Sequence, residues 1–238
     1  MLLFMIQSLA HASAEGGSFT IQAMWESSGF IARSVIITLI LMLFWTFVVS
    51  IERILAFNRA RNESMRLQVE VVKPLQAGDL NKALAITQDE QYKSSYLAAI
   101  LSAGIKEMAE QQSEQGLSNA MRAIDKAVHE ETSKMRRGMT VLATVGSTAP
   151  FVGLFGTTFG VINAFNAMGE GTGLSDISAG IAEALITTGV GIGVAVVGVW
   201  MFNYFNMRAD KVRDELTSSE SDFLAWGTKQ LQSNAAEK

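Results

Sequence analysis

The segment "SAGIAEALITTGVGIGVAVVGVW", from Ser178 to Trp200, is long and apolar enough to cross a lipid bilayer as a helix. It nevertheless carries one carboxylate, Glu183, and two adjacent hydroxyls, Thr187 and Thr188. Ionisable groups are rare in membrane helices, and they usually face a protein interior or water. The segment therefore predicts a membrane-spanning helix whose polar side chains need an explanation.

Two other runs of the sequence have the same apolar character. One covers residues 34–51 and the other 139–168, while the segment quoted above continues over 177–205. A helical span needs about 20 apolar residues, so the sequence predicts an all-α membrane protein with three transmembrane helices. The apolar run at 1–6 is too short to span. It resembles part of a signal peptide, but its lack of a positively charged start favours an interfacial helix or a disordered lead.

The composition excludes several classes of protein. The chain has 238 residues, a net charge of −4 and no cysteine. It therefore offers no electrostatic basis for nucleic-acid binding and no thiolate metal site. His11 and His129 are far apart and have no ligand-spaced neighbours, so neither a metal site nor a histidine-based catalytic site is expected. With no phosphate-binding loop or nucleophile–base pattern, the sequence does not predict an enzyme.

The positive charges predict the orientation. Of the 19 Lys and Arg residues, all but Arg33 lie at the end of the first span, in the long middle block or in the tail. Since cytoplasmic segments are enriched in Lys and Arg, these three parts should be cytoplasmic. The predicted division is an outside N-terminal segment (1–33), a first span (34–57), a cytoplasmic helical domain (58–137), a second span (138–168), an outside loop (169–176), a third span (177–205) and a cytoplasmic C-terminal helix (206–238).

The cytoplasmic parts read as helices. Gly78 and Asp79 form a stop and the next N-cap, and Gly104 and Gly116 should punctuate later segments. From Leu117 onward, apolar residues recur in steps that keep one face apolar, which predicts one continuous helix running into the second span. The tail repeats this pattern over 212–226, so it should extend the third span as an amphipathic helix that packs on the middle block or on a neighbouring subunit.

Small residues fill the second and third spans. Such residues let membrane helices approach closely, which is a sufficient explanation for most of them. The positions assigned to helix packing are Gly153, Gly156, Gly160 and Gly180, together with Pro150.

The hydroxyls of these two spans have a register that ordinary packing does not require. The loop "GEGTG" centres near Thr172–Gly173, and Thr157 and Thr188 are equally far in sequence from that point, so they should lie at one depth on adjacent antiparallel helices. In an assembly of several subunits, such pairs would form part of a polar ring. Glu183 leaves two interpretations open: an interfacial carboxylate stabilised by its helix dipole, or the outer mouth of an ion path. No Asp, Glu or Lys lies well inside a span, so a proton path would need a carboxylate from another chain.

Two quoted stretches carry a family resemblance. "TVGSTAPFVGLFGTTFGVINAF" (144–165) followed by "GIAEALITTGVGIGVAV" (180–196) resembles the paired signature of the MotA/TolQ/ExbB proton-channel family, on its ExbB/TolQ side. The resemblance covers 139–205 closely and extends in topology, and in "ERILAF" (52–57), to the rest. Where the family commonly has a proline, this chain has Ala179, which affects only the start of the helix.

The resemblance implies a motor of the bacterial inner membrane. The family's subunits form a pentamer around two single-span helices of an ExbD- or TolR-like partner, whose membrane Asp carries the proton, and a TonB- or TolA-like protein can receive the force in the periplasm. Protons are the coupling ion and no other cofactor is implied; besides these partners, only membrane lipid is expected, and no nucleic acid. Thr157 and Thr188 match the family's channel threonines, Glu183 matches its "IAEAL" carboxylate, and Ser147, Thr148 and Thr187 add hydroxyls that would line the path.

Two other classes remain open on the sequence. A structural membrane scaffold would use the small residues for packing alone and would show no proton dependence. A self-contained channel would work without a partner, which the lack of a mid-membrane carboxylate disfavours.

Overall fold

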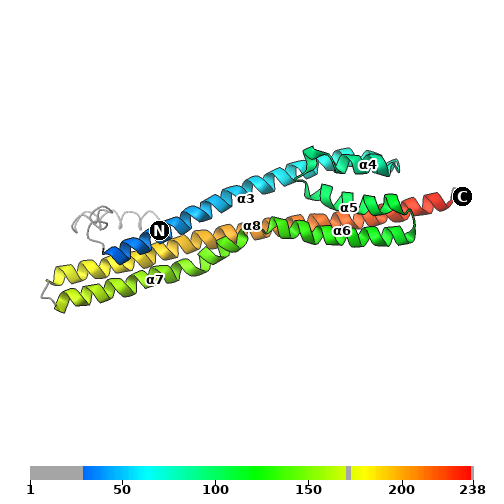
Figure 1. Cartoon of the computed structure of the whole chain (residues 1–238). Coiled ribbons are helices and arrows are strands. Elements are labelled where there is room, and N and C mark those ends of the chain that lie inside the picture. Colours follow the sequence, from blue (N-terminus) through cyan, green and yellow to red (C-terminus); the bar gives the residue numbers. More distant parts are fainter. Residues whose placement is uncertain (1–28, 170–172, 237–238) are drawn as a thin grey trace, which may run out of the picture. The chain divides into compact units, whose positions relative to one another are not determined.

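The computed structural model describes residues 29–169 and 173–236, and every regular element in these ranges is a helix (Figure 1). The apolar run at 1–6 and most of the outside N-terminal segment lie outside the described residues, as do residues 170–172 of the outside loop. The all-α prediction is confirmed.

Three helices are long and apolar enough to cross a membrane, as the sequence predicts. They are α3 (Phe30–Gln76), α7 (Met139–Gly169) and α8 (Leu174–Ala236), and the remaining helices of the described part do not meet that description. In Figure 1, α7 and the first part of α8 lie side by side. Together with the apolar surface described below, these helices identify a multi-pass membrane protein.

The chain divides into two compact units. Among the described residues, the first unit consists of residues 29–46, 143–169 and 173–199, and the second of residues 47–142 and 200–236. Helices α3 and α8 each contribute to both units without a break. The first unit therefore holds the small-residue hairpin, and the second holds the helices of the middle block and the tail.

The first unit exposes many large apolar side chains. Water-soluble surfaces rarely collect so many, whereas a lipid-facing or subunit-facing surface requires them. The exposed side chains include Ile37, Leu41, Phe44, Trp45, Phe151, Phe155, Phe165 and Leu185.

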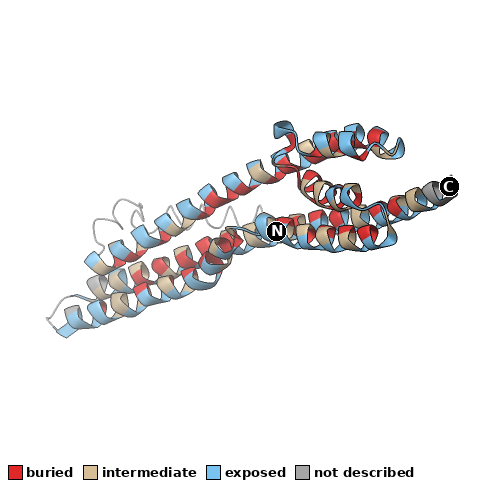
Figure 2. Ribbon diagram, turned by 45° about the vertical axis from the view of Figure 1, so that its right-hand side comes forward, coloured by how far each residue is buried: buried red, intermediate tan, exposed pale blue. Residues whose placement is uncertain are grey.

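The second unit has a conventional apolar core. It contains the C-terminal parts of α3 and α8, from Phe47 and from Trp200 onward. It also contains α4 (Leu80–Thr87), the short 3-10 helix η1 (Glu90–Tyr92), α5 (Tyr96–Glu110) and α6 (Glu114–Met135). Buried residues recur along one side of these helices, and exposed residues follow the other (Figure 2). The fully buried side chains include Leu67, Ile105, Phe205 and Leu216, which belong to helices far apart in sequence.

The tail packs on the middle block, as one of the two predicted alternatives has it. Phe223 of α8 is buried in the same core as the α5 and α6 residues. Trp226 adds a polar tie, because its indole Nε1 donates a hydrogen bond of 2.9 Å to the carbonyl oxygen of Leu75. The amphipathic steps of the tail therefore bury one side of α8 in the second unit.

The glycine predictions have mixed outcomes. Gly78 adopts a φ of +72° and is followed by the N-cap Asp79, whose Oδ1 accepts from the Lys82 N–H at 3.0 Å, as predicted. Gly116 lies in the first turn of α6, so it does mark a segment start. The prediction for Gly104 is wrong: it lies inside α5, where a Cβ would come within 2.5 Å of Ile124 Cδ1, so its role is close packing.

The prediction of one continuous helix from Leu117 into the second span is also wrong. Helix α6 ends at Met135, and α7 begins only at Met139. Between them, Gly138 adopts a φ of +79°, a left-handed conformation that glycine accepts without a Cβ penalty and that terminates helices. The apolar pattern runs through this point because both helices bury their faces in the same core.

Replacing Gly138 with alanine should destabilise the protein through this conformation alone. A Cβ at this position would meet only Val49 Cγ1 at 3.7 Å, an ordinary contact, so crowding contributes nothing. A left-handed residue other than glycine costs about 1–2 kcal/mol, and asparagine tolerates the conformation better. In thermal unfolding of the purified chain, Gly138→Ala should therefore be less stable than Gly138→Asn. Equal stability of the two variants would contradict this account.

A buried phenol makes the second unit sensitive to alkaline pH. Tyr96 Oη donates a hydrogen bond of 2.6 Å to Glu215 Oε2, and burial, followed by this carboxylate, raises the pKa of Tyr96 above its ordinary value. The unfolded chain releases the phenol proton near pH 10 while the folded chain retains it, so stability is present below that pH and is lost as the pH rises further.

Tyr96→Phe should reduce this dependence of stability on alkaline pH. We expect a loss of about 1 kcal/mol at neutral pH, from the missing hydrogen bond, and a smaller further loss above pH 10 than in the original chain. Unfolding by denaturant at pH 8 and pH 10.5 measures both quantities. A pH dependence unchanged by the substitution would assign the alkaline loss to other groups.

Candidate functional site

Helices α7 and α8 of the first unit approach each other closely through glycines. A Cβ on Gly153 would come within 2.7 Å of the carbonyl oxygen of Thr187, and one on Gly191 within 2.7 Å of that of Ala149. Such distances leave no room for a side chain on either position. Along the same line, Gly156 faces Thr187 and Gly160 faces Ala184. The predicted packing role of these glycines thus agrees with the geometry.

The line of small residues continues toward the loop end of the hairpin. At Gly180 of α8, a Cβ would lie 3.1 Å from Ala164 Cβ of α7. This pair reverses the arrangement at Gly160, where the glycine is on α7 and the alanine, Ala184, is on α8. Span one also takes part, because Val35 Cγ1 lies 3.0 Å from the Cβ position of Gly156. Sequence reasoning missed Val35, since a valine in an apolar run carries no signal of which neighbour it packs on.

Thr157 and Thr188 meet across the helix pair. Their hydroxyl oxygens lie 3.3 Å apart, within hydrogen-bond distance, on α7 and α8 respectively. The prediction that the two residues occupy one level of the hairpin is confirmed. Both residues are partly exposed, and Thr157 also donates to the Leu154 carbonyl at 2.7 Å. The Thr188 hydroxyl can thus turn toward a group from another chain while the Thr157 hydroxyl keeps its hydrogen bond to the Leu154 carbonyl.

Thr187 has a different place from its neighbour Thr188. It is fully buried, and its hydroxyl bonds the carbonyl oxygens of Ala184 at 2.7 Å and of Gly153 at 3.2 Å. The second contact joins α8 to α7. Within this chain, Thr187 therefore ties the helices together behind the Thr157–Thr188 pair.

Glu183 lies apart from that pair. It precedes Thr188 by five residues, which places the two side chains about 140° apart around α8 at 3.6 residues per turn. The residue is half-buried, and its Oε1 atom is shielded from solvent without a hydrogen-bond partner in the described structure. A buried carboxylate oxygen without a donor is destabilising. Glu183 thus offers an unused acceptor to a group from another chain.

Ser147 and Thr148 are not brought to the pair either. Both are exposed, and both donate to the carbonyl oxygen of Thr144, at 3.1 Å and 2.7 Å. They precede Thr157 by about ten residues, or about 15 Å along α7. Pro150 lies inside α7 without ending the helix. Ser147 and Thr148 therefore form a second polar level of α7, separate from the level of Thr157.

At two further glycines of α8, the described structure has open space where a side chain would lie. At Gly189 and Gly193 a Cβ would meet nothing within 4 Å. Unlike Gly191 between them, these glycines are not needed for packing inside this chain. Among the described residues, no group of three or more His, Asp and Glu could hold a metal ion.

Comparisons with known proteins cover the region that contains this hairpin. The family model described as the MotA/TolQ/ExbB proton channel family matches residues 92–218. The chain is 32% identical to a biopolymer transport protein ExbB of Xanthomonas campestris pv. campestris, over 94% of this chain and 99% of that protein. It is also 32% identical to a Tol-Pal system protein TolQ of Pseudomonas aeruginosa, over 62% of this chain and 67% of that protein. The matched region includes both helices of the hairpin.

Proposed function

Because this chain belongs to the MotA/TolQ/ExbB proton channel family, we propose that it is the ring-forming subunit of a proton-driven motor in a bacterial inner membrane. In this proposal five copies surround two single-span helices of an ExbD- or TolR-like partner. Proton flow through the ring turns or displaces the partner, and the resulting force serves a task in the periplasm. The family consists of proton channels rather than enzymes.

The observation that carries the proposal is the hydroxyl pair on the close-packed hairpin. Thr157 and Thr188 present two hydroxyls, 3.3 Å apart, at one level of a surface otherwise made of apolar and small residues. An ionised carboxylate in such surroundings depends on hydrogen-bond donors far more strongly than a protonated carboxyl group does. The pair would therefore stabilise the partner's Asp when charged, and would release it on protonation.

The other site residues take supporting roles in this proposal. The spans of this chain supply no mid-membrane acid, so the partner must bring the titrating group. Glu183 would line the outer mouth, where its unpartnered Oε1 can accept a hydrogen bond from the partner. Ser147 and Thr148 would extend the polar path toward the other face, and Thr187 would hold the helix pair in register.

The proposed topology follows from the positive charges. The N-terminal segment (1–33) and the loop at 169–176 would be periplasmic, and the domain at 58–137 and the tail at 206–238 cytoplasmic. The task downstream has two leading candidates, since this chain is similar both to a biopolymer transport protein and to a Tol-Pal system protein. They are TonB-type energisation of uptake and Tol-type maintenance of the envelope, with gliding as a further use of the same motor.

Native mass measurement of the complex, extracted gently from its own membranes, tests the proposal. Five copies of this chain with two copies of a single-span, Asp-bearing protein are expected, and the partner's periplasmic domain would indicate the task. Purified complex should also carry protons into vesicles under an imposed potential. A monomer or dimer without such a partner, and with no proton flux in any preparation, would instead support a structural scaffold.

A further inference from the structure

The second unit contains a cavity that neither Thr157 nor Thr188 lines. Its volume is about 860 Å³, which lies in the range of small-molecule sites. Three segments form its wall: residues 53–60 of α3, residues 87–102 around η1 and the start of α5, and residues 131–137 at the end of α6. These segments are distant in sequence, so the cavity is a product of the fold.

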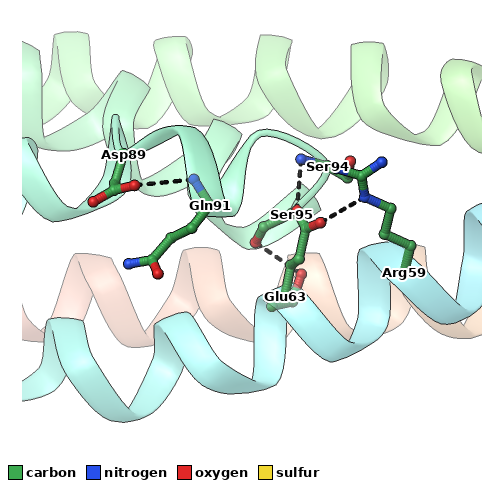
Figure 3. A network of polar contacts seen from close by, with 7 residues as sticks. Arg59, Glu63, Asp89, Gln91, Ser94 and Ser95 are labelled. Atoms are coloured by element: carbon green, nitrogen blue, oxygen red, sulfur yellow. Dashed lines mark hydrogen bonds and ion pairs between the residues drawn. The ribbon is translucent and has the colours of Figure 1, made fainter.

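Basic side chains outnumber acidic ones on this wall. Among the acidic residues, Glu131 binds Lys134 at 2.6 Å, and Asp89 caps the Gln91 N–H at 2.9 Å (Figure 3). Arg59 pairs with Glu63, which lies just behind the wall and also accepts from the Ser94 N–H (Figure 3). The lining residues with charge are Arg53, Arg59, Lys93, Lys134 and Arg137, against Asp89, Glu90 and Glu131.

Three of these basic side chains, Lys93, Arg137 and Arg53, have N–H groups that could donate further hydrogen bonds. No ion pair engages Lys93 or Arg137 within the described ranges, and both side chains are exposed beside the cavity. Arg53 is only 9% exposed. Its Nη2 pairs with Glu52 and its Nη1 reaches the Lys134 carbonyl at 3.5 Å, yet its Nε is buried without a partner. A buried guanidinium donor that lacks an acceptor points to an acceptor from outside the chain.

The position of the cavity indicates where this acceptor comes from. Arg53 follows the apolar run of α3, and Arg137 immediately precedes the link to the apolar helix α7. In the topology proposed above, on which this inference rests, both residues lie where membrane helices leave the lipid on the cytoplasmic side. The wall also has an apolar part, and Leu55 on it is 64% exposed. Basic pockets between helices at this level suit phospholipid headgroups.

We propose that this cavity binds a phosphate group, supplied by the headgroup of an anionic phospholipid of the cytoplasmic leaflet. Arg53 provides a buried, charge-assisted hydrogen bond, and Lys93 and Arg137 neutralise the remaining charge at the entrance. The lipid would join the end of α3, the start of α5 and the end of α6, which only the fold brings together.

Titration of the purified full chain in a non-ionic detergent tests the proposal. The probes are dihexanoyl-phosphatidylglycerol, dihexanoyl-phosphatidylcholine and inorganic phosphate, and the readout is calorimetric binding. The test variant is Lys93→Gln/Arg137→Gln, in which both replaced side chains are exposed and the fold is preserved. Its matched control is Arg122→Gln/Lys126→Gln, which removes the same charge from an exposed side of α6 that does not line the cavity.

Phosphatidylglycerol should bind saturably, at least about tenfold more tightly than phosphatidylcholine, and the test variant should lose about tenfold in affinity while the control retains it. Equal affinity in all three proteins, or an equal loss in both variants, would overturn the site. Binding of inorganic phosphate as tightly as the lipid would overturn the lipid as its source. An independent check is Arg53→Gln, which should abolish the lipid preference if its buried donor meets the phosphate.

Discussion

Valine in place of Thr188 is expected to cut proton-driven work by about 10- to 100-fold while leaving assembly intact. The estimate follows from the loss of one hydrogen bond to a charged group, worth about 1.5–3 kcal/mol, at about 1.4 kcal/mol per tenfold in rate. Valine keeps the shape of threonine, and the hydroxyl removed is the one 3.3 Å from Thr157 Oγ1. Helix packing should therefore be unaffected.

Proton uptake by vesicles that contain this chain and its partner measures the effect. Thr158→Val is the matched control, because the exposed Thr158 hydroxyl donates to the Leu154 carbonyl of its own helix, at 3.0 Å, and to no other group among the residues that the structure describes. Uptake should fall in the first variant and remain near normal in the second. Normal uptake by Thr188→Val would remove the hydroxyl pair from the mechanism.

Alanine in place of Gly153 should have the largest effect on the fold. The added methyl would lie 2.7 Å from the Thr187 carbonyl oxygen and 3.0 Å from Thr188 Cα. Both atoms belong to the backbone, so no side-chain rotation relieves the contact and the helices must move apart. Overpacking costs about 1–3 kcal/mol, and a rigid neighbour places this case near the upper end. The displacement would also separate Thr157 from Thr188.

Gly193→Ala provides the comparison for this prediction. It adds the same methyl to α8 at a position where nothing lies within 4 Å, and alanine favours a helix more than glycine does. The unfolding temperature of the purified chain should fall for Gly153→Ala and be unchanged or slightly higher for Gly193→Ala. Similar temperatures for the two variants would show that the close approach of α7 and α8 is not what stabilises the hairpin.

Much of the membrane part could be predicted because its rules are local. Apolar length gives the spans, and antiparallel symmetry about a short loop places Thr157 opposite Thr188. Both inferences use only the rise of a helix and the width of a bilayer. The separation of Glu183 from this pair also follows from helix periodicity. It was missed because only the depths of the residues, and not their angles around α8, were compared.

Other features depend on information that residue patterns do not carry. A glycine within a helical pattern is usually tolerated, and nothing in the pattern says that Gly138 adopts a positive φ while Gly104 remains helical. The cavity beside Arg53 joins segments whose proximity only the packed core determines. Its unpartnered Nε could not have been found from the order of residues.

The unbroken course of α8 has a mechanical consequence. From Trp200 to Ala236 this helix contains no proline and a single glycine, Gly227, so it lacks the usual causes of a kink. In the proposed motor, a force applied beside Thr188 would therefore act on a helix that continues without a break into the tail. Helix α7 begins instead at Met139, directly after the left-handed Gly138 that separates it from α6. The proposal thus assigns transmission of the force to α8, whereas α7 is separated from α6 by the break at Gly138.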